Sequence, residues 1–167
     1  SDKGNMSRDD IDFSIDNLVK LKKDGHWRAL WSSFNQSVQL MSSGEVVIQS
    51  MWSPAVTAVR SQGIPCIYQD LQEGYRSWTD GHVLAKHVDG KKLGAAYDYA
   101  TWYHSGPVGA MFARQGYYVV TPENTKKVLP AAEWDFWFEG KAATIEIYDP
   151  FGNLLEKPGT IRDGGSY

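Results

Sequence analysis

The chain has 167 residues, of which 42% are hydrophobic, 22% charged and 13% aromatic, a composition typical of a globular protein that buries a sizeable core. Seventeen basic and twenty acidic residues leave a net charge of -3 without a basic cluster, which argues against a nucleic-acid partner. The apolar runs and residues 1–10 predict neither a membrane span nor an uncleaved signal peptide.

The chain offers few groups for metal or redox chemistry. Cys66 is the single cysteine, so neither an internal disulfide nor a zinc site built from cysteines is expected. Its thiol, expected in a buried strand, suits the cytoplasm and the periplasm equally. His82 and His87 have a spacing that is more typical of surface histidines than of a metal pair. We therefore predict no metal ion and no cofactor.

Two helices are predicted at the start of the chain. Residues 9–23 place their apolar side chains on one helical face and their charged side chains outside it. Ser7 and Asp10 form a capping signal at the start of this helix, and Gly25 stands where it should end. Residues 35–42 predict a second, shorter helix.

The next segment reads as strand, helix, strand. Residues 45–51 carry the β-branched run of a buried strand, and residues 65–69 predict a second short strand. Between them, a helix is expected over residues 53–62, with Ser53 as its N-cap and a proline in its first turn. Residues 45–69 therefore predict one βαβ unit with parallel strands.

The second half of the chain is predicted to be helical and then rich in turns. Helices are expected over residues 91–104 and 107–115, with a short one from 121–122 and another over 130–138. From residue 141 onward, turn residues replace any periodic pattern. No internal repeat is present, and the predicted class is α/β.

Paired acids offer an enzymatic alternative. Each of three neighbouring pairs is interpreted as a pair of solvated carboxylates, because hydrolysis needs two carboxyl groups that face each other across a substrate. The alternative function is a small hydrolase or carbohydrate-active domain that would use Glu73 and Asp80. The three pairs are Asp70 with Glu73, Glu133 with Asp135, and Glu146 with Asp149.

Aromatic rings close to an acid suggest a binding site for a cation. In an extended segment Trp78 and Asp80 point to the same side, so an indole and a carboxylate share one space. This pair suits an organic ammonium group through cation–π attraction and a charge-assisted hydrogen bond. Trp52 follows the predicted strand 45–51, and the carboxyl ends of parallel strands are where open α/β sheets hold ligands.

The order of several short motifs resembles the spermidine/putrescine-binding proteins of bacterial ABC transporters, which are type II periplasmic solute-binding proteins. The resemblance extends over nearly the whole chain, and its most specific part is the Trp-x-Asp segment with an upstream Glu-Gly. The motifs are Gly44-Glu45-Val46 leading into Met51-Trp52-Ser53, the short strand at Cys66, Glu73-Gly74 before Trp78-Thr79-Asp80, and Gly116-Tyr117 ahead of Thr121-Pro122.

The resemblance implies a fold and a location. It implies a periplasmic-binding-protein-like fold of type II, mostly a second lobe of three αβα layers with segments that return to the first lobe. Residues 1–77 would be the second-lobe segment with its βαβ unit, 78–125 the crossover and first-lobe helices, and 126–167 the return segment and loop-rich tail. The protein would be periplasmic, would lack catalysis and would deliver its solute to the membrane permease of an ABC importer.

The resemblance also implies a ligand and a set of binding residues. The ligand would be a polyamine held between two lobes, although a monoamine, an amino acid or another small cation stays open. The ligand-binding residues implied are Trp52, Trp78, Asp80, Tyr117, Ser33, Phe34 and Asn35.

A macromolecular partner is a further expectation. Relative to that family, the chain lacks counterparts of the N-terminal lobe and of part of the sheet. The amphipathic helices after Gly90 would then leave apolar faces in water, at a cost of about 25 cal/mol per Å². A second chain or another copy of this chain is therefore expected to cover those faces.

Overall fold

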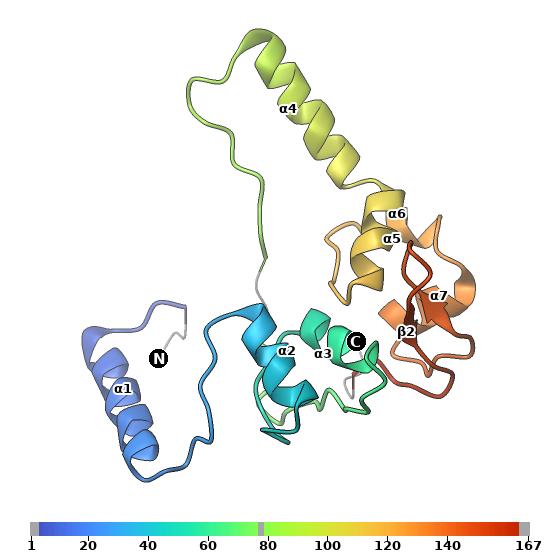
Figure 1. Ribbon diagram of the computed structural model, residues 1–167. Coiled ribbons are helices and arrows are strands. Elements are labelled where there is room, and N and C mark those ends of the chain that lie inside the picture. Colours follow the sequence, from blue (N-terminus) through green and yellow to red (C-terminus); the bar gives the residue numbers. More distant parts are fainter. Residues whose placement is uncertain (1–3, 77–78, 164–167) are drawn as a thin grey trace. The chain divides into compact units, whose positions relative to one another are not determined.

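The computed structural model describes residues 4–76 and 79–163 and divides into two compact units, Ser1–Gln49 and Ser50–Tyr167 (Figure 1). Secondary structure in the described residues comprises seven α-helices and one antiparallel pair of short strands. The described part is thus mostly helical with a minor sheet, and a fold of three αβα layers stays a prediction. No helix among the described residues is both long and apolar enough to span a membrane.

The first unit contains α1 (Arg8–Lys23) and α2 (Phe34–Ser42). The capping box predicted for α1 is confirmed, because the Ser7 hydroxyl accepts a hydrogen bond from the Asp10 amide while the Asp10 carboxylate accepts one from the Ser7 amide, both at 3.2 Å. Helix α1 has no buried residue, so its apolar face is exposed within the described chain.

The predicted strand over residues 45–51 is wrong. This segment forms hydrogen bonds with α2 instead. The Val46 amide donates to the Leu40 carbonyl at 3.3 Å, and the Gln49 side chain donates to the Ser37 carbonyl at 2.6 Å. Val47 and Ile48 are 84% and 89% exposed. A β-branched run becomes a strand only beside a chain that completes its hydrogen bonds, and the described residues provide none here.

The second strand of the predicted βαβ unit, residues 65–69, is also absent. The Cys66 carbonyl accepts a hydrogen bond from Arg60 Nε at 3.0 Å, so this segment is held by a side chain of the preceding helix rather than by a strand. Cys66 is half-buried in an irregular segment, and not in a strand. The βαβ prediction is therefore corrected to one helix between two irregular segments.

The second unit begins with α3 (Ser53–Arg60), which starts one residue earlier than an N-cap at Ser53 would place it. Trp52 occupies the N-cap position without a side-chain cap, and the Ser53 hydroxyl is directed elsewhere. The remaining helices agree with the predicted ranges to within a few residues. They are α4 (Gly90–Tyr103), α5 (Gly106–Arg114), α6 (Pro122–Lys126) and α7 (Ala131–Phe138).

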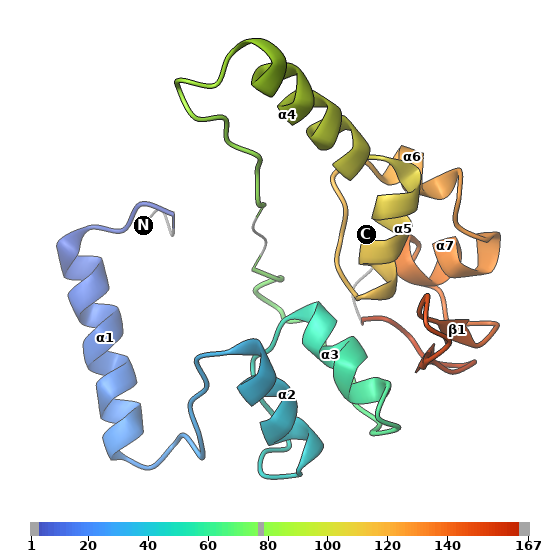
Figure 2. The ribbon, with the colours of Figure 1, turned by 45° about the horizontal axis from the view of Figure 1, so that its top comes forward.

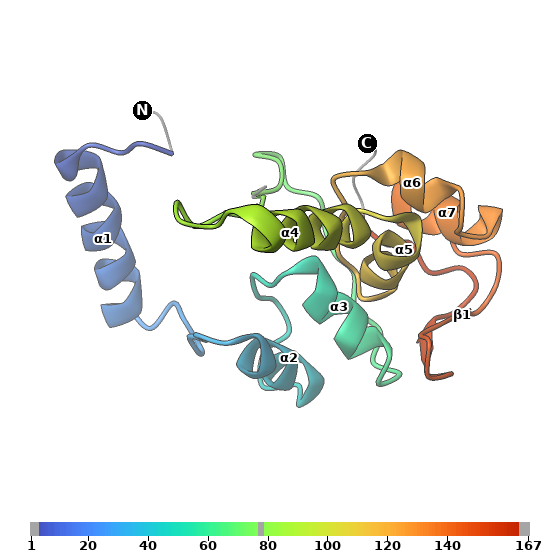
Figure 3. The same ribbon diagram turned by 90° about the horizontal axis from the view of Figure 1, so that it is seen from above.

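Helices α5, α6 and α7 lie close to the C-terminal hairpin (Figures 2 and 3). Side chains from these helices, from the hairpin and from connecting loops form one apolar core. Close contact of α5 with α6 requires Gly109, because a Cβ at this position would overlap the Thr125 side chain. The core is completed by residues from the hairpin and from the loops that connect these helices. Its buried members are Ala110, Ala113, Leu129, Phe136, Trp137, Ala143 and Ile147.

The tail contains a hairpin that sequence analysis missed. Strands β1 (Ile147–Tyr148) and β2 (Leu154–Glu156) pair antiparallel. The Asp149 carboxylate accepts hydrogen bonds from the amides of Phe151 and Asn153, both at 2.8 Å, which closes the turn. The side-chain hydrogen bond from Asn153, more than any other contact, lowers the pKa of Asp149. The strands are too short for an alternating pattern to reveal them.

One of the acids interpreted as solvated is instead part of the core. Glu133 is buried and accepts two hydrogen bonds from Arg114, each 2.8 Å long. The hydrogen bond with Glu133 is the main reason why the pKa of Arg114 is raised. Arg114 lies in the last turn of α5 and Glu133 in the first turn of α7, where each charge also suits the helix dipole. The interpretation was wrong here because spacing along the chain does not reveal a partner 19 residues away.

Candidate functional site

The turn after α5 lies directly against the first turn of α3. The Ser53 hydroxyl donates a hydrogen bond to the Gly116 carbonyl at 2.8 Å. Gly116 is buried and has a φ of +86°, and a Cβ built on it would lie 2.9 Å from Pro54 Cα and 2.6 Å from Thr57 Oγ1. Both the backbone conformation and the close approach therefore require glycine.

This contact brings together the two chain segments that carry two of the predicted ligand residues. Trp52 directly precedes Ser53, and Tyr117 directly follows Gly116. Their side chains are 41% and 37% exposed, so each ring keeps substantial surface open to solvent. In the sequence they are far apart, and the Ser53–Gly116 hydrogen bond joins the two segments that carry them.

A continuous series of aromatic contacts extends from Tyr117. Its ring lies 6.1 Å from that of Phe112, which lies 5.2 Å from that of Tyr103. Tyr103 contacts His82 in an edge-to-face arrangement, with ring centroids 4.6 Å apart. Sequence reasoning missed this cluster, although the many aromatic residues in 97–103 were a visible signal.

The cluster reaches the segment that contains Asp80. Asp80 is exposed and lies two residues before His82, whose ring also contacts His104 at 5.4 Å. The aromatic series therefore connects the Trp52 and Tyr117 segments with the chain around Asp80. Trp78 lies outside the described residues, so its predicted alignment with Asp80 stays a prediction.

The third group of predicted ligand residues lies in the first unit. Ser33 is the N-cap of α2, where its hydroxyl accepts a hydrogen bond from the Gln36 amide at 3.3 Å. Phe34 is the first residue of the helix and is partly buried, whereas Asn35 is exposed. This local capping accounts for Ser33 without a ligand, and a binding role for the three residues stays a prediction.

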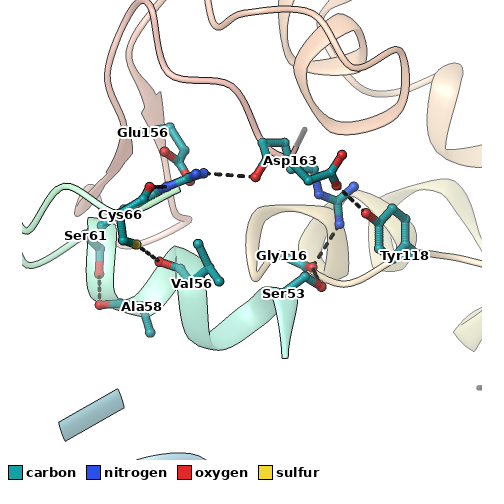
Figure 4. A network of polar contacts seen from close by, with 11 residues as sticks. Ser53, Val56, Ala58, Ser61, Cys66, Gly116, Tyr118, Glu156 and Asp163 are labelled. Atoms are coloured by element: carbon teal, nitrogen blue, oxygen red, sulfur yellow. Dashed lines mark hydrogen bonds and ion pairs between the residues drawn. The ribbon is translucent and has the colours of Figure 1, made fainter. Parts of the chain in front are cut away.

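A buried arginine near the end of the described chain, Arg162, supports the turn at Gly116 (Figure 4). Arg162 is only 4% exposed; its Nη2 donates to the Gly116 carbonyl at 2.9 Å and its Nη1 donates to the Trp137 carbonyl. Its Cζ lies 3.8 Å from the ring centroid of Tyr118, whose hydroxyl donates to the Asp163 carboxylate at 2.6 Å. Burial lowers the pKa of Arg162 to about 10, so the guanidinium keeps its charge at neutral pH.

A buried ion pair between Arg60 and Glu156 adjoins Arg162. Arg60 Nη1 lies 3.5 Å from the Glu156 carboxylate and also donates to the Arg162 carbonyl at 3.2 Å. Desolvation outweighs the attraction of Arg60 and raises the pKa of Glu156 to about 7. Desolvation is also the largest cause of the raised pKa of the Cys66 thiol, which makes this cysteine a poor nucleophile.

No group of three or more potential metal ligands occurs among residues 4–76 and 79–163. A hollow of about 410 Å³ lies beside α6 and α7, and none of the predicted ligand residues lines it. Its charged side chains form ion pairs with one another, such as Lys141 with Asp135 at 3.0 Å. The segments that carry Trp52 and Tyr117, with their exposed rings, are therefore taken as the candidate site.

Comparison with known proteins identifies the family. The sequence model described as bacterial extracellular solute-binding protein matches residues 1–137. The match includes every predicted ligand residue and ends within α7, before the C-terminal hairpin. The chain therefore belongs to the bacterial extracellular solute-binding proteins, an ABC-type family of solute receptors that are generally not enzymes. No curated protein and no solved structure matches the chain.

Proposed function

We propose that this chain is the substrate-binding component of an ABC importer, or part of one, and that it binds a polyamine or a related amine-bearing solute. The observation that carries the proposal is the Ser53–Gly116 contact, which joins the segments of Trp52 and Tyr117. Further support comes from the aromatic series that continues from Tyr117 to His82, which lies two residues after Asp80 in the sequence.

The chemistry of these side chains suits a cation. An ammonium group over an indole or phenol face gains about 0.5–2 kcal/mol, depending on how far it is desolvated. The Asp80 carboxylate would add a charge-assisted hydrogen bond. Trp78, two residues earlier in the sequence, would add a second apolar face for a methylene chain. Closure of two lobes over the ligand would exclude water and strengthen both interactions.

We expect Trp52→Ala or Asp80→Asn to weaken amine binding more than about tenfold, which corresponds to about 1.4 kcal/mol. Titration calorimetry with spermidine, putrescine, a monoamine, an amino acid and a sugar measures this directly. The matched controls are Trp27→Ala, a tryptophan of similar exposure in the other unit, and Asp98→Asn, an exposed acid on α4. Wild-type affinity in both site variants would exclude this site.

The same titrations separate the enzymatic alternative from the receptor. Turnover of a sugar substrate that is lost in Glu73→Gln would support a carbohydrate-active domain instead. Binding of amines without product formation supports the receptor. Glu73 and Asp80 are both exposed, whereas the general acid of a hydrolase typically lies in buried, apolar surroundings.

We also propose that another chain covers exposed apolar surface of this protein. Ile11, Ile15 and Leu18 lie on one face of α1 and are all exposed. Size-exclusion chromatography with light scattering should therefore give a mass above that of one chain, or a mass that rises with protein concentration. A concentration-independent mass of 18.7 kDa would contradict self-association.

A further inference from the structure

We propose that Arg162 is a positioning residue for the candidate site: it holds the Gly116 carbonyl, and with it the turn that presents Tyr117 beside the start of α3. Arg162 lies beyond the residues matched by the family, in the segment after the hairpin. The hydrogen bonds and the ring contact of Arg162 are the evidence that it positions the turn. The expected effect on ligand affinity rests on the proposed function.

The contacts of Arg162 are directional. Two nitrogens of one guanidinium donate to two different carbonyls, those of Gly116 and Trp137, while the guanidinium lies over the Tyr118 ring. A planar guanidinium with fixed donor directions can hold two carbonyls at once, whereas a lysine ammonium reaches them only as a point charge. Arg162 therefore ties the turn on one side to the core helix α7 on the other.

The Gly116 carbonyl is held from two sides. It accepts one hydrogen bond from Ser53 at 2.8 Å and another from Arg162 at 2.9 Å. Two donors on one carbonyl occupy both lone-pair directions, so rotation of the 116–117 peptide would break both bonds. The orientation of that peptide sets the direction in which Tyr117 leaves the turn.

Arg162 is itself fixed by its neighbours. Its carbonyl accepts a hydrogen bond from Arg60, and the adjacent Asp163 accepts one from Tyr118. The C-terminal segment is thus attached both to α3 and to the turn, as Figure 4 shows. Burial of a guanidinium costs free energy that the carbonyl bonds and the stacked ring must offset, so the bonds to the turn are strongly coupled to the position of Arg162.

Amide exchange can report the order of this turn. The Gly116 amide donates to the Ala113 carbonyl at 2.8 Å, and the Tyr117 amide donates to the Phe112 carbonyl at 3.0 Å. These bonds protect the two amides from hydrogen exchange only while the turn keeps its conformation. Their exchange rates relative to those of core amides therefore measure the positioning of the turn, without any ligand.

The test compares Arg162→Gln with Leu129→Ala, a truncation in the apolar core at a residue between α6 and α7. In Arg162→Gln we expect the Gly116 and Tyr117 amides to exchange at least about tenfold faster relative to amides of α7, and amine affinity to fall by about tenfold or more. In Leu129→Ala we expect lower stability, a uniform rise in exchange and unchanged affinity. The same pattern of exchange in both variants would overturn the proposal.

Two further outcomes keep the test decisive. If Arg162→Gln does not fold, Arg162→Lys replaces it, and wild-type exchange of both turn amides in Arg162→Lys overturns the proposal. If wild-type protein binds amines and Arg162→Gln binds them equally well, the link between Arg162 and the site is overturned. If wild-type protein binds no amine, the proposed function fails, and the exchange rates alone still decide whether Arg162 positions the turn.

Discussion

Gly116→Ala should destabilise the protein by about 3 kcal/mol or more. An alanine at φ +86° costs about 1–2 kcal/mol, because its Cβ approaches the following carbonyl oxygen. The added methyl group would also overlap Pro54 Cα and Thr57 Oγ1, and overpacking of this kind costs about 1–3 kcal/mol. Denaturant unfolding of the two proteins measures the sum.

Gly152→Ala is the matched control for this substitution. Gly152 has the same φ of +86°, but a Cβ there would have no atom within 4 Å. Its substitution should therefore cost only the backbone strain, about 1–2 kcal/mol, and should leave binding unchanged. Equal losses of stability in the two variants would mean that the close approach of the turn to α3 contributes nothing.

The stability of the protein should fall as Glu156 loses its proton. The pKa of this carboxyl is raised from 4.5 to about 7 by burial, so between these values the folded chain retains a proton that the unfolded chain releases. Its contribution to stability is therefore complete below pH 4.5 and is lost as the pH rises through about 7. At about 1.4 kcal/mol per pKa unit, the loss amounts to about 3 kcal/mol.

Glu156→Gln isolates this contribution from that of other titrating groups. The difference in unfolding free energy between wild type and Glu156→Gln, measured from about pH 4 to about pH 8, should change by about 3 kcal/mol in favour of the variant. Glu146→Gln, at an exposed acid just before β1, is the matched control for the substitution itself. A wild-type protein that gains stability over this range relative to Glu156→Gln would show that Arg60 keeps the carboxyl ionised.

The helices could be predicted because their ends are marked locally. The Ser7–Asp10 capping box and the left-handed Gly25 bracket α1, and the proline in the first turn of α3 marks its start. Those signals act between residues within one or two helical turns. The N-cap of α3 was misassigned to Ser53 because that hydroxyl bonds to the distant Gly116 carbonyl instead of the helix.

The strands could not be predicted by the same means. Residues 45–51 and 65–69 have suitable composition, but within the described chain no neighbouring strand completes their hydrogen bonds. Conversely, β1 and β2 form where the pattern is too short to read, because the Asp149 turn brings them together. Pairing is a property of two segments, and a pattern in one segment is not sufficient evidence for it.

For the candidate site too, the sequence suggested the residues, and only the structure showed the contacts between their segments. Trp52, Tyr117 and Asp80 were selected from residue type and from a family resemblance, and membership of the solute-binding family is confirmed. The contact that joins the segments of Trp52 and Tyr117 joins residues 63 positions apart, and the Arg162 bond joins residues 46 apart. Neither contact has a local signature, so both were found only in three dimensions.

By itself, the sequence determined which segments form helices and, to within a few residues, where those helices start and stop, and it indicated the family to which the chain belongs. The tertiary structure decided that Glu133, Glu156 and Arg162 are buried, that the Gly116 turn lies against α3, and that residues 45–51 and 65–69 form no strand with any described part of the chain. The physical reason is the range of the interactions. Caps and glycine conformations act within a few residues, whereas desolvation, ion pairing and strand pairing depend on which distant residues come into contact.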